Sequence, residues 1–155
     1  MNMHDILSKE AIKTKIKAVN KKQLLQDIAI LASDIVGIPT MDIAKSLQQR
    51  EILGPTGMGN GVAIPHVKIG GLTKICGFFS RLESPIDFDS ADKQPVDLIF
   101  TLLAPENNSG TDHLKALAMV SRMFSNKDIR LKLRAAENTE SLFAILTSNE
   151  DSKAA

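Results

Sequence analysis

The spacing of apolar residues changes twice along this chain, and this change limits the folds that it can adopt. In the first third, apolar side chains recur at intervals of three and four, as on one face of a helix. In the middle third they form short runs bounded by Gly, Pro and Asp, as in β-strands. In the last third the helical interval returns. This order, without a repeat or a low-complexity linker, predicts a single α/β domain with a mixed β-sheet flanked by helices on both faces.

The helical segments have boundaries that the sequence marks. The first helix is expected over about residues 20–36, and Gly37 and Pro39 end it. A second helix is expected from Thr40, as its cap, to about Leu53. The apolar stripes that predict the helices are Leu24, Ile28, Leu31 and Ile35; Ile43 and Leu47; Leu117, Val120 and Phe124; Ile129 to Leu133; and Leu142, Ile145 and Leu146.

The apolar runs in the middle of the chain predict the strands. They are Gly61 to Pro65, Thr73 to Arg81 and Val96 to Leu103, with Pro85 to Phe88 as a short edge strand. The run from Val96 is expected at the centre of the sheet because almost all of it is apolar. The order of the strands does not follow from the sequence. The whole chain, residues 1–155, is expected to form one domain with a core over about residues 5–148 and a short disordered C-terminal tail.

Charge and composition exclude several classes of function. Nineteen Lys and Arg against 18 Asp and Glu give a net charge of +1, which indicates no basic surface for nucleic acid or an anionic membrane. No apolar stretch approaches the roughly 18 residues needed to span a bilayer, and residues 1–5 lack the pattern of a signal peptide. The single Cys76 cannot form an internal disulfide, which is typical of a reducing compartment. The protein is therefore expected in the cytoplasm.

The segment from Gly54 to His66 is the least typical part of the sequence. Four glycines fall within eight residues, which permits left-handed backbone angles and close approach of another group to the main chain. The segment is either a long turn between a helix and a strand or a cradle of backbone N–H groups for an anion. Nucleotide motifs do not fit, because no Lys follows these glycines and Val62 replaces the third glycine of a dinucleotide fingerprint.

Two histidines are candidates for chemistry. His66 follows a predicted strand and Pro65, beside the glycine segment, where a neutral imidazole is well placed as a nucleophile. His113 begins a predicted helix that Thr111 or Ser109 would cap, where the positive end of the helix dipole favours phosphate. Both histidines also fit a structural role, and His113 in particular shares a helical stripe with apolar residues that follow it.

Arg50 closes the second predicted helix. It is either a solvated residue that interacts with the helix C-terminus or a planar, permanently charged partner for phosphate oxygens. A metal site is not favoured, because the three histidines lie far apart and form no His-x-x-x-His or His-Glu-x-x-His pattern. The Gly-x-Ser-x-Gly pattern of a hydrolase nucleophile is missing from the sequence. We therefore expect neither a metal nor a cofactor.

Four short segments together resemble the fructose/mannitol-type EIIA domain of the bacterial phosphotransferase system. They are Arg50-Glu51, Thr56-Gly57-Met58-Gly59, Gly61-Val62-Ala63-Ile64-Pro65-His66 and His113-Leu114-Lys115-Ala116-Leu117. The resemblance extends from about Asp5 to about Leu146. Within the family, the stretch from Asp112 to Phe124 is most similar to the nitrogen-regulatory subtype.

This resemblance implies a function. His66 would accept a phosphoryl group, as a tele-phosphohistidine, from the phosphohistidine of a phosphocarrier protein (NPr/HPr-like). Arg50, His113 and Thr56 would surround that group. The protein would regulate target proteins according to its phosphorylation state, with potassium transport or a sensor kinase among the expected targets. The implied fold, a mixed sheet flanked by helices, agrees with the hydrophobic pattern.

Two alternatives stay open. A sugar-specific (fructose/mannitol) EIIA component would pass the phosphoryl group to a permease EIIB domain, and such components can also be solitary domains. A non-catalytic interaction module would use both histidines only for packing. Phosphorylation of His66 separates the last alternative from the other two.

Overall fold

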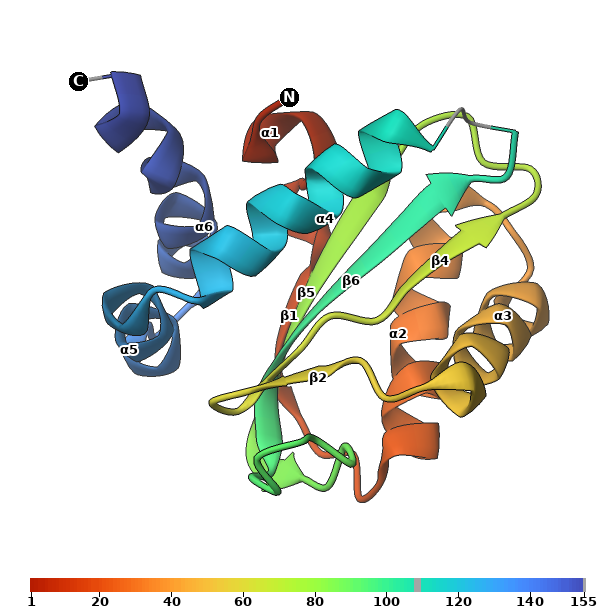
Figure 1. Cartoon of the computed structure of the whole chain (residues 1–155), viewed down its shortest axis with the longest axis horizontal. Helices are drawn as coiled ribbons and strands as arrows, with labels where there is room; N and C mark the ends of the chain where they lie inside the picture. Colours follow the sequence, from red (N-terminus) through yellow and green to blue (C-terminus); the bar gives the residue numbers. More distant parts are fainter. Residues whose placement is uncertain (108–109, 155) are drawn as a thin grey trace.

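The computed structural model describes the chain from Met1 to Ala154 except residues 108 and 109, with side chains described as far as residue 148 (Figure 1). The helices are α1 (Met3–Ile6), α2 (Lys21–Val36), α3 (Thr40–Leu53), α4 (Thr111–Phe124), α5 (Lys127–Ala135) and α6 (Thr139–Ala154), with a 3-10 turn at Lys9–Ala11. The strands are β1 (Ile12–Ile16), β2 (Gly57–Gly59), β3 (Val62–Ala63), β4 (His66–Ile69), β5 (Cys76–Ile86) and β6 (Val96–Pro105). Within this range no helix is long and apolar enough to cross a membrane.

One mixed sheet contains all six of these strands. The strand order is β1-β5-β6-β3-β2, and β4 also pairs with β6. β5 and β6 are antiparallel, whereas β1 runs parallel to β5 and both β3 and β4 run parallel to β6. β6 is therefore the central strand, as its apolar sequence predicts.

Helices cover both faces of this sheet, as the sequence predicts. Figure 1 shows α4 crossing one face, with α2 and α3 on the other side. The burial of β6 agrees, because every side chain from Leu98 to Ala104 is buried although successive side chains point to opposite faces. The rings of Phe79 and Phe100 lie about equally far from Phe124 of α4, with centroids 6.1 and 6.0 Å away, and join the sheet to that helix.

The first two long helices match their predicted ranges, and their ends have identifiable causes. The Asn20 side chain caps α2 by accepting a hydrogen bond from the Gln23 N–H at 2.8 Å. Gly37 ends α2 in the left-handed conformation, with φ of 77°. The prediction for the start of α3 was wrong by one residue: Pro39 occupies the cap position and Thr40 is the first helical residue.

Three strand predictions need correction. β1 is absent from the predicted set because its five residues, Ile-Lys-Thr-Lys-Ile, carry only two apolar side chains at an edge of the sheet. Pro85 lies inside β5, so residues 85–88 do not form a separate strand. Of the predicted strand over residues 61–65, only Val62–Ala63 is a strand, β3, and the next strand, β4, begins after it at His66.

The last helix, α6, contains the predicted C-terminal limit of the core. The backbone of α6 continues to Ala154, beyond the predicted core limit near residue 148. The side chains from residue 149 onward lie outside the described residues, as does Ala155. The predicted disordered tail therefore stays a prediction.

Gly77 in β5 leaves room for an aromatic ring of the neighbouring strand. A Cβ atom at Gly77 would lie 2.7 Å from two ring carbons of Phe100, which is fully buried. We expect Gly77→Ala to lower the free energy of unfolding by about 1–3 kcal/mol, because ring and strand cannot both keep their positions. Chemical denaturation measures this change. Gly70→Ala is the control, because a Cβ there would meet only the flexible end of Glu106. Equal losses in the two variants would contradict crowding at Gly77.

Candidate functional site

His66 is the first residue of β4, which pairs with the central strand β6. Val62 of β3 pairs with Leu98 and His66 of β4 pairs with Leu102, so both short strands follow β6 in one register. The break between them falls at Pro65, which lacks an N–H for a ladder hydrogen bond but accepts one from the Leu102 N–H at 2.9 Å. The sequence predicts His66 just after a strand. In the structure His66 is itself the first residue of a strand, and its backbone pairs with β6.

The contacts of the half-buried His66 ring fix which nitrogen carries the proton. Its Nδ1 lies 2.7 Å from the carbonyl oxygen of Ile64. A carbonyl can only accept a hydrogen bond, so we assign the hydrogen to Nδ1 in the neutral ring. The lone pair is then on Nε2, which lies 3.5 Å from Nη2 of Arg50. A neutral His66 in this arrangement presents a nucleophilic Nε2 to a fixed positive charge.

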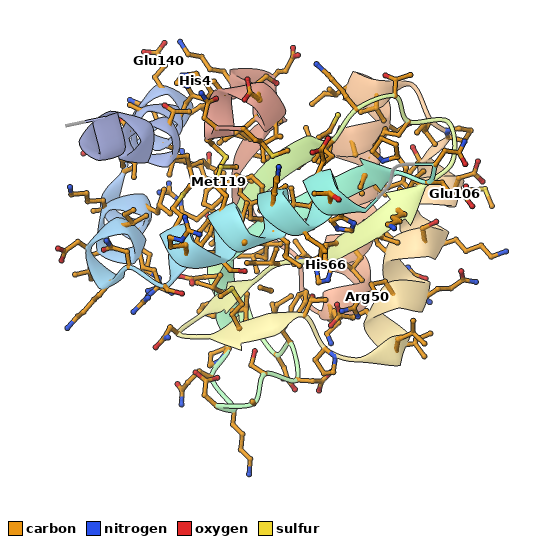
Figure 2. All side chains as sticks on the ribbon, turned by 45° about the horizontal axis from the view of Figure 1, so that its top comes forward. His4, Arg50, His66, Glu106, Met119 and Glu140 are labelled. Carbon is orange, nitrogen blue, oxygen red and sulfur yellow. The ribbon has the colours of Figure 1, made fainter. Side chains whose placement is uncertain are left out.

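Arg50 lies in the last turn of α3, and its side chain is held between that turn and His66. Its Nη1 donates a hydrogen bond of 2.9 Å to the carbonyl oxygen of Gly54. This contact confirms the predicted interaction with the helix C-terminus, while Nη2 faces His66. Figure 2 shows the two side chains next to one another, below α4 and beside α3. Both alternatives for Arg50 are thus compatible with one position.

His113 lies in the first turn of α4 and contacts His66. The two rings meet edge to face, with centroids 5.9 Å apart and planes 74° apart. Nε2 of His113 is buried and has no hydrogen-bond partner among the described residues. Burial lowers the pKa of His113, and electrostatic interactions with His66 and Lys68 lower it further. A neutral His113 is therefore favoured.

The cap of α4 differs from the prediction. Gly110 occupies the cap position in the left-handed conformation, with φ of 90°, and Thr111 is the first helical residue. Ser109 lies outside the described residues. The helical stripe that follows His113 packs into the core through the buried Val120 and Phe124. The predicted packing role is therefore confirmed for the apolar residues of the stripe, whereas His113 at its start contacts the His66 ring.

Thr56 follows the turn after α3 and is almost fully buried, with 7% of its surface exposed. Its hydroxyl donates to Glu51 Oε1 at 2.6 Å, and its N–H donates to Glu51 Oε2 at 3.0 Å. The resemblance implied that Thr56 surrounds the phosphoryl group. In this conformation its hydroxyl hydrogen is directed to Glu51, so Thr56 shapes the turn beside His66.

The glycine segment is a turn, and internal hydrogen bonds hold it. Gly59, Asn60 and Gly61 have consecutive positive φ angles of 94°, 58° and 78°, which turn the chain from β2 into β3. The Asn60 N–H donates to Asp92 Oδ2 at 2.9 Å. The N–H groups of Thr56 and Ile64 are also used internally. Of the two alternatives for this segment, these contacts favour the turn and not the anion cradle.

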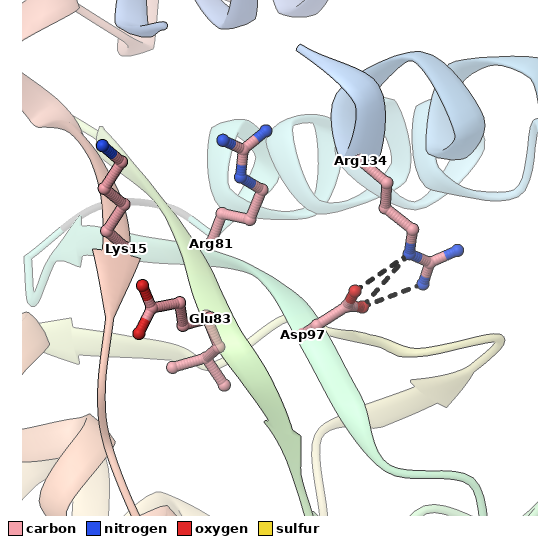
Figure 3. Close-up of a pocket in the computed structure, with 6 residues that line it drawn as sticks. Lys15, Arg81, Glu83, Asp97 and Arg134 are labelled. Carbon is pink, nitrogen blue, oxygen red and sulfur yellow. Dashed lines mark hydrogen bonds and ion pairs between the residues drawn. The ribbon is translucent and has the colours of Figure 1, made fainter. Parts of the chain in front are cut away.

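A cluster of charged residues anchors the same turn from the other side (Figure 3). Arg134 of α5 donates to both carboxylate oxygens of Asp97 at 2.9–3.2 Å and to the Asn60 carbonyl at 2.8 Å. The cavity beside this pair has a volume of about 290 Å³. It is lined by Lys15, Arg81, Leu82, Glu83, Asp97 and Arg134. None of the predicted site residues lines it, so we assign this cluster to structure.

Two residues at the site were given no role from the sequence. Glu51 accepts hydrogen bonds from Thr56, and Lys21 of α2 forms an ion pair with Glu51 at 2.9 Å. A carboxylate in the last turn of a helix opposes the helix dipole, so the position of Glu51 in the sequence indicated that it needs a specific partner.

Across the described residues, we find no group of three or more His, Cys, Asp or Glu side chains that could hold a metal ion.

The lowered pKa of His113 predicts a pH dependence of stability. In the unfolded chain a His has a pKa of about 6.5, and burial holds the pKa lower in the folded protein. Below that pH the unfolded chain binds the proton more readily, so the free energy of unfolding falls as pH drops through about 6.5 toward the folded pKa. We expect His113→Gln to show a shallower fall in urea denaturation between about pH 7 and pH 5. An unchanged or steeper fall would contradict this origin.

Comparisons with known proteins identify the family. The family model for the phosphoenolpyruvate-dependent sugar phosphotransferase system, EIIA 2, matches residues 5–149. The chain is 47% identical to a nitrogen regulatory protein of Bradyrhizobium diazoefficiens, covering 94% of this chain and 95% of that protein. It is 38% identical to a nitrogen regulatory protein of Escherichia coli, covering 97% and 92%.

A solved structure agrees with these matches. The crystal structure of nitrogen regulatory protein IIA-Ntr from Neisseria meningitidis aligns with a TM-score of 0.87 and 38% identity, over 92% of this chain and 97% of that one. Sequence and fold therefore agree over nearly the whole chain. This protein belongs to the EIIA type-2 family of the phosphoenolpyruvate-dependent sugar phosphotransferase system and is similar, within that family, to nitrogen regulatory proteins.

Proposed function

We propose that this protein is a phosphoryl carrier that accepts a phosphoryl group on Nε2 of His66 and regulates partner proteins according to its phosphorylation state. The observation that carries the proposal is the contact of His66 Nδ1 with the Ile64 carbonyl, which leaves the Nε2 lone pair directed toward Arg50. The donor would be the phosphohistidine of an NPr/HPr-like phosphocarrier protein. The role would be regulatory rather than metabolic, as the names of the relatives suggest.

The transfer step follows from this geometry. The Nε2 lone pair forms the new N–P bond while the N–P bond to the donor ring breaks, and the electron pair of that bond returns to the donor ring. His66 gains positive charge on its ring as the bond forms, and the Ile64 carbonyl offsets this charge by accepting the Nδ1 hydrogen. The protein contributes mainly position and charge, which is what phosphoryl transfer requires.

The neighbours of His66 would stabilise the charge on the phosphoryl oxygens. Arg50 supplies a permanent positive charge within 3.5 Å of Nε2. His113 has a buried Nε2 without a partner among the described residues, and this nitrogen can donate to a phosphoryl oxygen when it carries the hydrogen. Thr56 would support the turn that holds Arg50 rather than donate directly. These roles require no metal.

Partner proteins would bind around the phosphorylation site. Ile52 and Leu53 come two and three residues after Arg50 and are 83% and 84% exposed. Leu114 directly follows His113 and is 69% exposed. Exposed apolar side chains beside a site are typical of docking surfaces. Phosphorylation adds a charge of about −2 next to them, which a partner can detect. Potassium transport proteins and a sensor kinase are the expected targets, in the cytoplasm.

Incubation with a phosphorylated carrier protein tests the proposal. We expect a mass gain of about 80 Da, the mass of one phosphoryl group, which acid removes. Two-dimensional ¹H–¹⁵N NMR of the imidazole should place phosphorus on Nε2 of His66. A protein that stays unmodified, or a phosphoryl group on His113, would reject the assignment. The experiment also excludes or supports the non-catalytic interaction module.

A choice of donor separates regulation from sugar uptake. We expect faster transfer from a carrier of the nitrogen-regulatory branch than from the general sugar carrier, since the most similar relatives that we report are nitrogen regulatory proteins. Comparison of single-turnover rates with both donors measures this preference. Faster transfer from the sugar carrier, followed by transfer to a permease EIIB domain, would favour the sugar-specific alternative.

A further inference from the structure

A partly buried ion pair between Lys21 and Glu51 contacts the turn that leads to the proposed phosphorylation site. Glu51, which is 8% exposed, accepts three hydrogen bonds on its carboxylate: the two from Thr56 and one from Lys21 Nζ at 2.9 Å. Lys21 also donates to Asp89 Oδ2 at 2.9 Å, and its ammonium lies 4.8 Å from the centroid of the Phe88 ring. One carboxylate therefore joins the start of α2, the end of α3 and the turn that follows α3.

Stability alone does not account for this arrangement. Burial of an ion pair costs desolvation energy that the attraction only partly offsets. A carboxylate in the last turn of a helix also opposes the helix dipole. Replacement of buried ion pairs by well-packed apolar residues of similar volume is often neutral or stabilising in proteins. What the pair supplies is a fixed geometry, with each carboxylate oxygen assigned to particular donors.

That geometry is transmitted to His66 through the backbone. The carbonyl of Thr56 accepts a hydrogen bond from the Ile64 N–H at 3.0 Å. The carbonyl of Ile64 in turn accepts from His66 Nδ1 at 2.7 Å. An unbroken series of hydrogen bonds thus runs from Lys21 through Glu51, Thr56 and Ile64 to the ring that would be phosphorylated.

The ion pair between Lys21 and Glu51 also affects the position of Arg50. Glu51 and Arg50 are neighbours in the last turn of α3, and the Gly54 N–H donates to the Glu51 main-chain oxygen at 3.2 Å. The Gly54 carbonyl holds Arg50 Nη1 at 2.9 Å. A shift of Thr56 away from Glu51 would move the turn at Gly54, and with it the guanidinium that faces His66.

We propose that Glu51, held by Lys21, is a positioning residue that sets the orientation of both His66 and Arg50. This inference rests on the proposed phosphoryl acceptance at His66. Burial by itself lowers the pKa of Lys21, but its hydrogen bonds to Glu51 and Asp89 and their negative charges raise that pKa above the usual value. The ammonium therefore stays charged at neutral pH and keeps the carboxylate in place.

The test combines a rate with a spectroscopic readout. Glu51→Gln removes the negative charge that holds Lys21, and its amide nitrogen cannot accept a hydrogen bond. In the place of Oε1 this nitrogen reverses the bond with the Thr56 hydroxyl, and in the place of Oε2 it loses the bonds from Lys21 and from the Thr56 N–H. We expect the maximal single-turnover rate of phosphorylation to fall roughly 10-fold to 100-fold, as for other small displacements of reacting groups. The carrier concentration at half-maximal rate should stay within about twofold, because the exposed side chains beside the site do not change. Lys21→Met should behave alike.

The tautomer of His66 distinguishes a positioning role from a purely structural one, because a loss of stability alone would not change it. We expect ¹⁵N chemical shifts to show the hydrogen almost entirely on Nδ1 in the natural protein, and shared between the two nitrogens in Glu51→Gln. Lys22→Met, a change at the exposed neighbouring lysine of α2, is the matched control and should alter neither quantity. This tautomer measurement uses no phosphate donor, so it tests the positioning role even if His66 accepts no phosphoryl group.

A second pair of variants covers the case in which Glu51→Gln does not fold. Thr56→Val removes only the hydroxyl that Glu51 holds, and Thr56→Ser keeps it. We expect Thr56→Val to lower the rate and mix the tautomers, and Thr56→Ser to restore both. Natural rates and a natural tautomer in a folded Glu51→Gln or in Thr56→Val would overturn the proposal.

Discussion

The His66→Ala variant is expected to accept no phosphoryl group from a phosphorylated carrier protein, whereas the natural protein gains about 80 Da. The substitution removes the ring nitrogen that carries a free lone pair and faces Arg50. We do not expect His113 to replace it, because its Nε2 is buried and so is not accessible to an incoming donor. Intact-mass measurement after incubation with excess donor checks this result.

Two controls make the loss specific. His4→Ala removes an exposed histidine of α1 that packs on Phe143, and Figure 2 places it away from His66. This control should be phosphorylated at the natural rate. His66→Ala itself should stay folded, with a free energy of unfolding within about 1 kcal/mol of the natural protein, because the ring is only half-buried. Full labelling of a folded His66→Ala would place the acceptor elsewhere.

The Arg50→Ala variant is expected to be phosphorylated on His66 at a maximal rate about 10²-fold to 10³-fold lower, the usual cost of removing one preorganised donor from a charged transition state. Arg50 brings positive charge to within 3.5 Å of His66 Nε2 while its other nitrogen is held by Gly54. Rapid-quench measurement of single-turnover rates at saturating carrier checks the magnitude.

Conservative and distant substitutions define what Arg50 supplies. Arg50→Lys keeps the charge but has no planar fork to hold Gly54 and face His66 together, so it should recover only a small part of the rate. Lys45→Ala removes an exposed positive charge from the same helix and should leave the maximal rate within about twofold. A rate loss in Lys45→Ala equal to that in Arg50→Ala would mean that net charge, not position, governs transfer.

The sequence predicted the parts of the fold that hydrophobic spacing encodes strongly. The ranges of α2 and α3 follow from apolar stripes and, for α2, from the stop at Gly37, and β6 follows from a run that is almost entirely apolar. β1 escaped prediction because half-exposed edge strands carry few apolar residues and are identified by their partner, here β5. Strand order depends on such long-range pairings, which local spacing does not contain.

The candidate site was predictable to a similar extent. Residue type and position singled out His66, Arg50 and His113, and the structure brings their side chains together although Arg50 and His66 are 16 positions apart. The roles assigned to these residues come from the family resemblance and stay predictions. The pairing of Lys21 with Glu51 spans 30 positions and joins two helices, so no local pattern could reveal it.

The pairing of β4 with the centre of the sheet constrains how a phosphorylated molecule can signal. His66 belongs to a strand whose four residues are all in register with β6, so the backbone under the imidazole has little freedom to rearrange. Under the proposed function, a binding partner would meet the same backbone in both states and would distinguish them by the added phosphoryl group and its charge. Such a contrast weakens with added salt, because counterions screen exposed charges beyond about 8 Å at physiological ionic strength. Under the proposed function, the ionic strength of the solution would therefore set how strongly a partner discriminates between the two states.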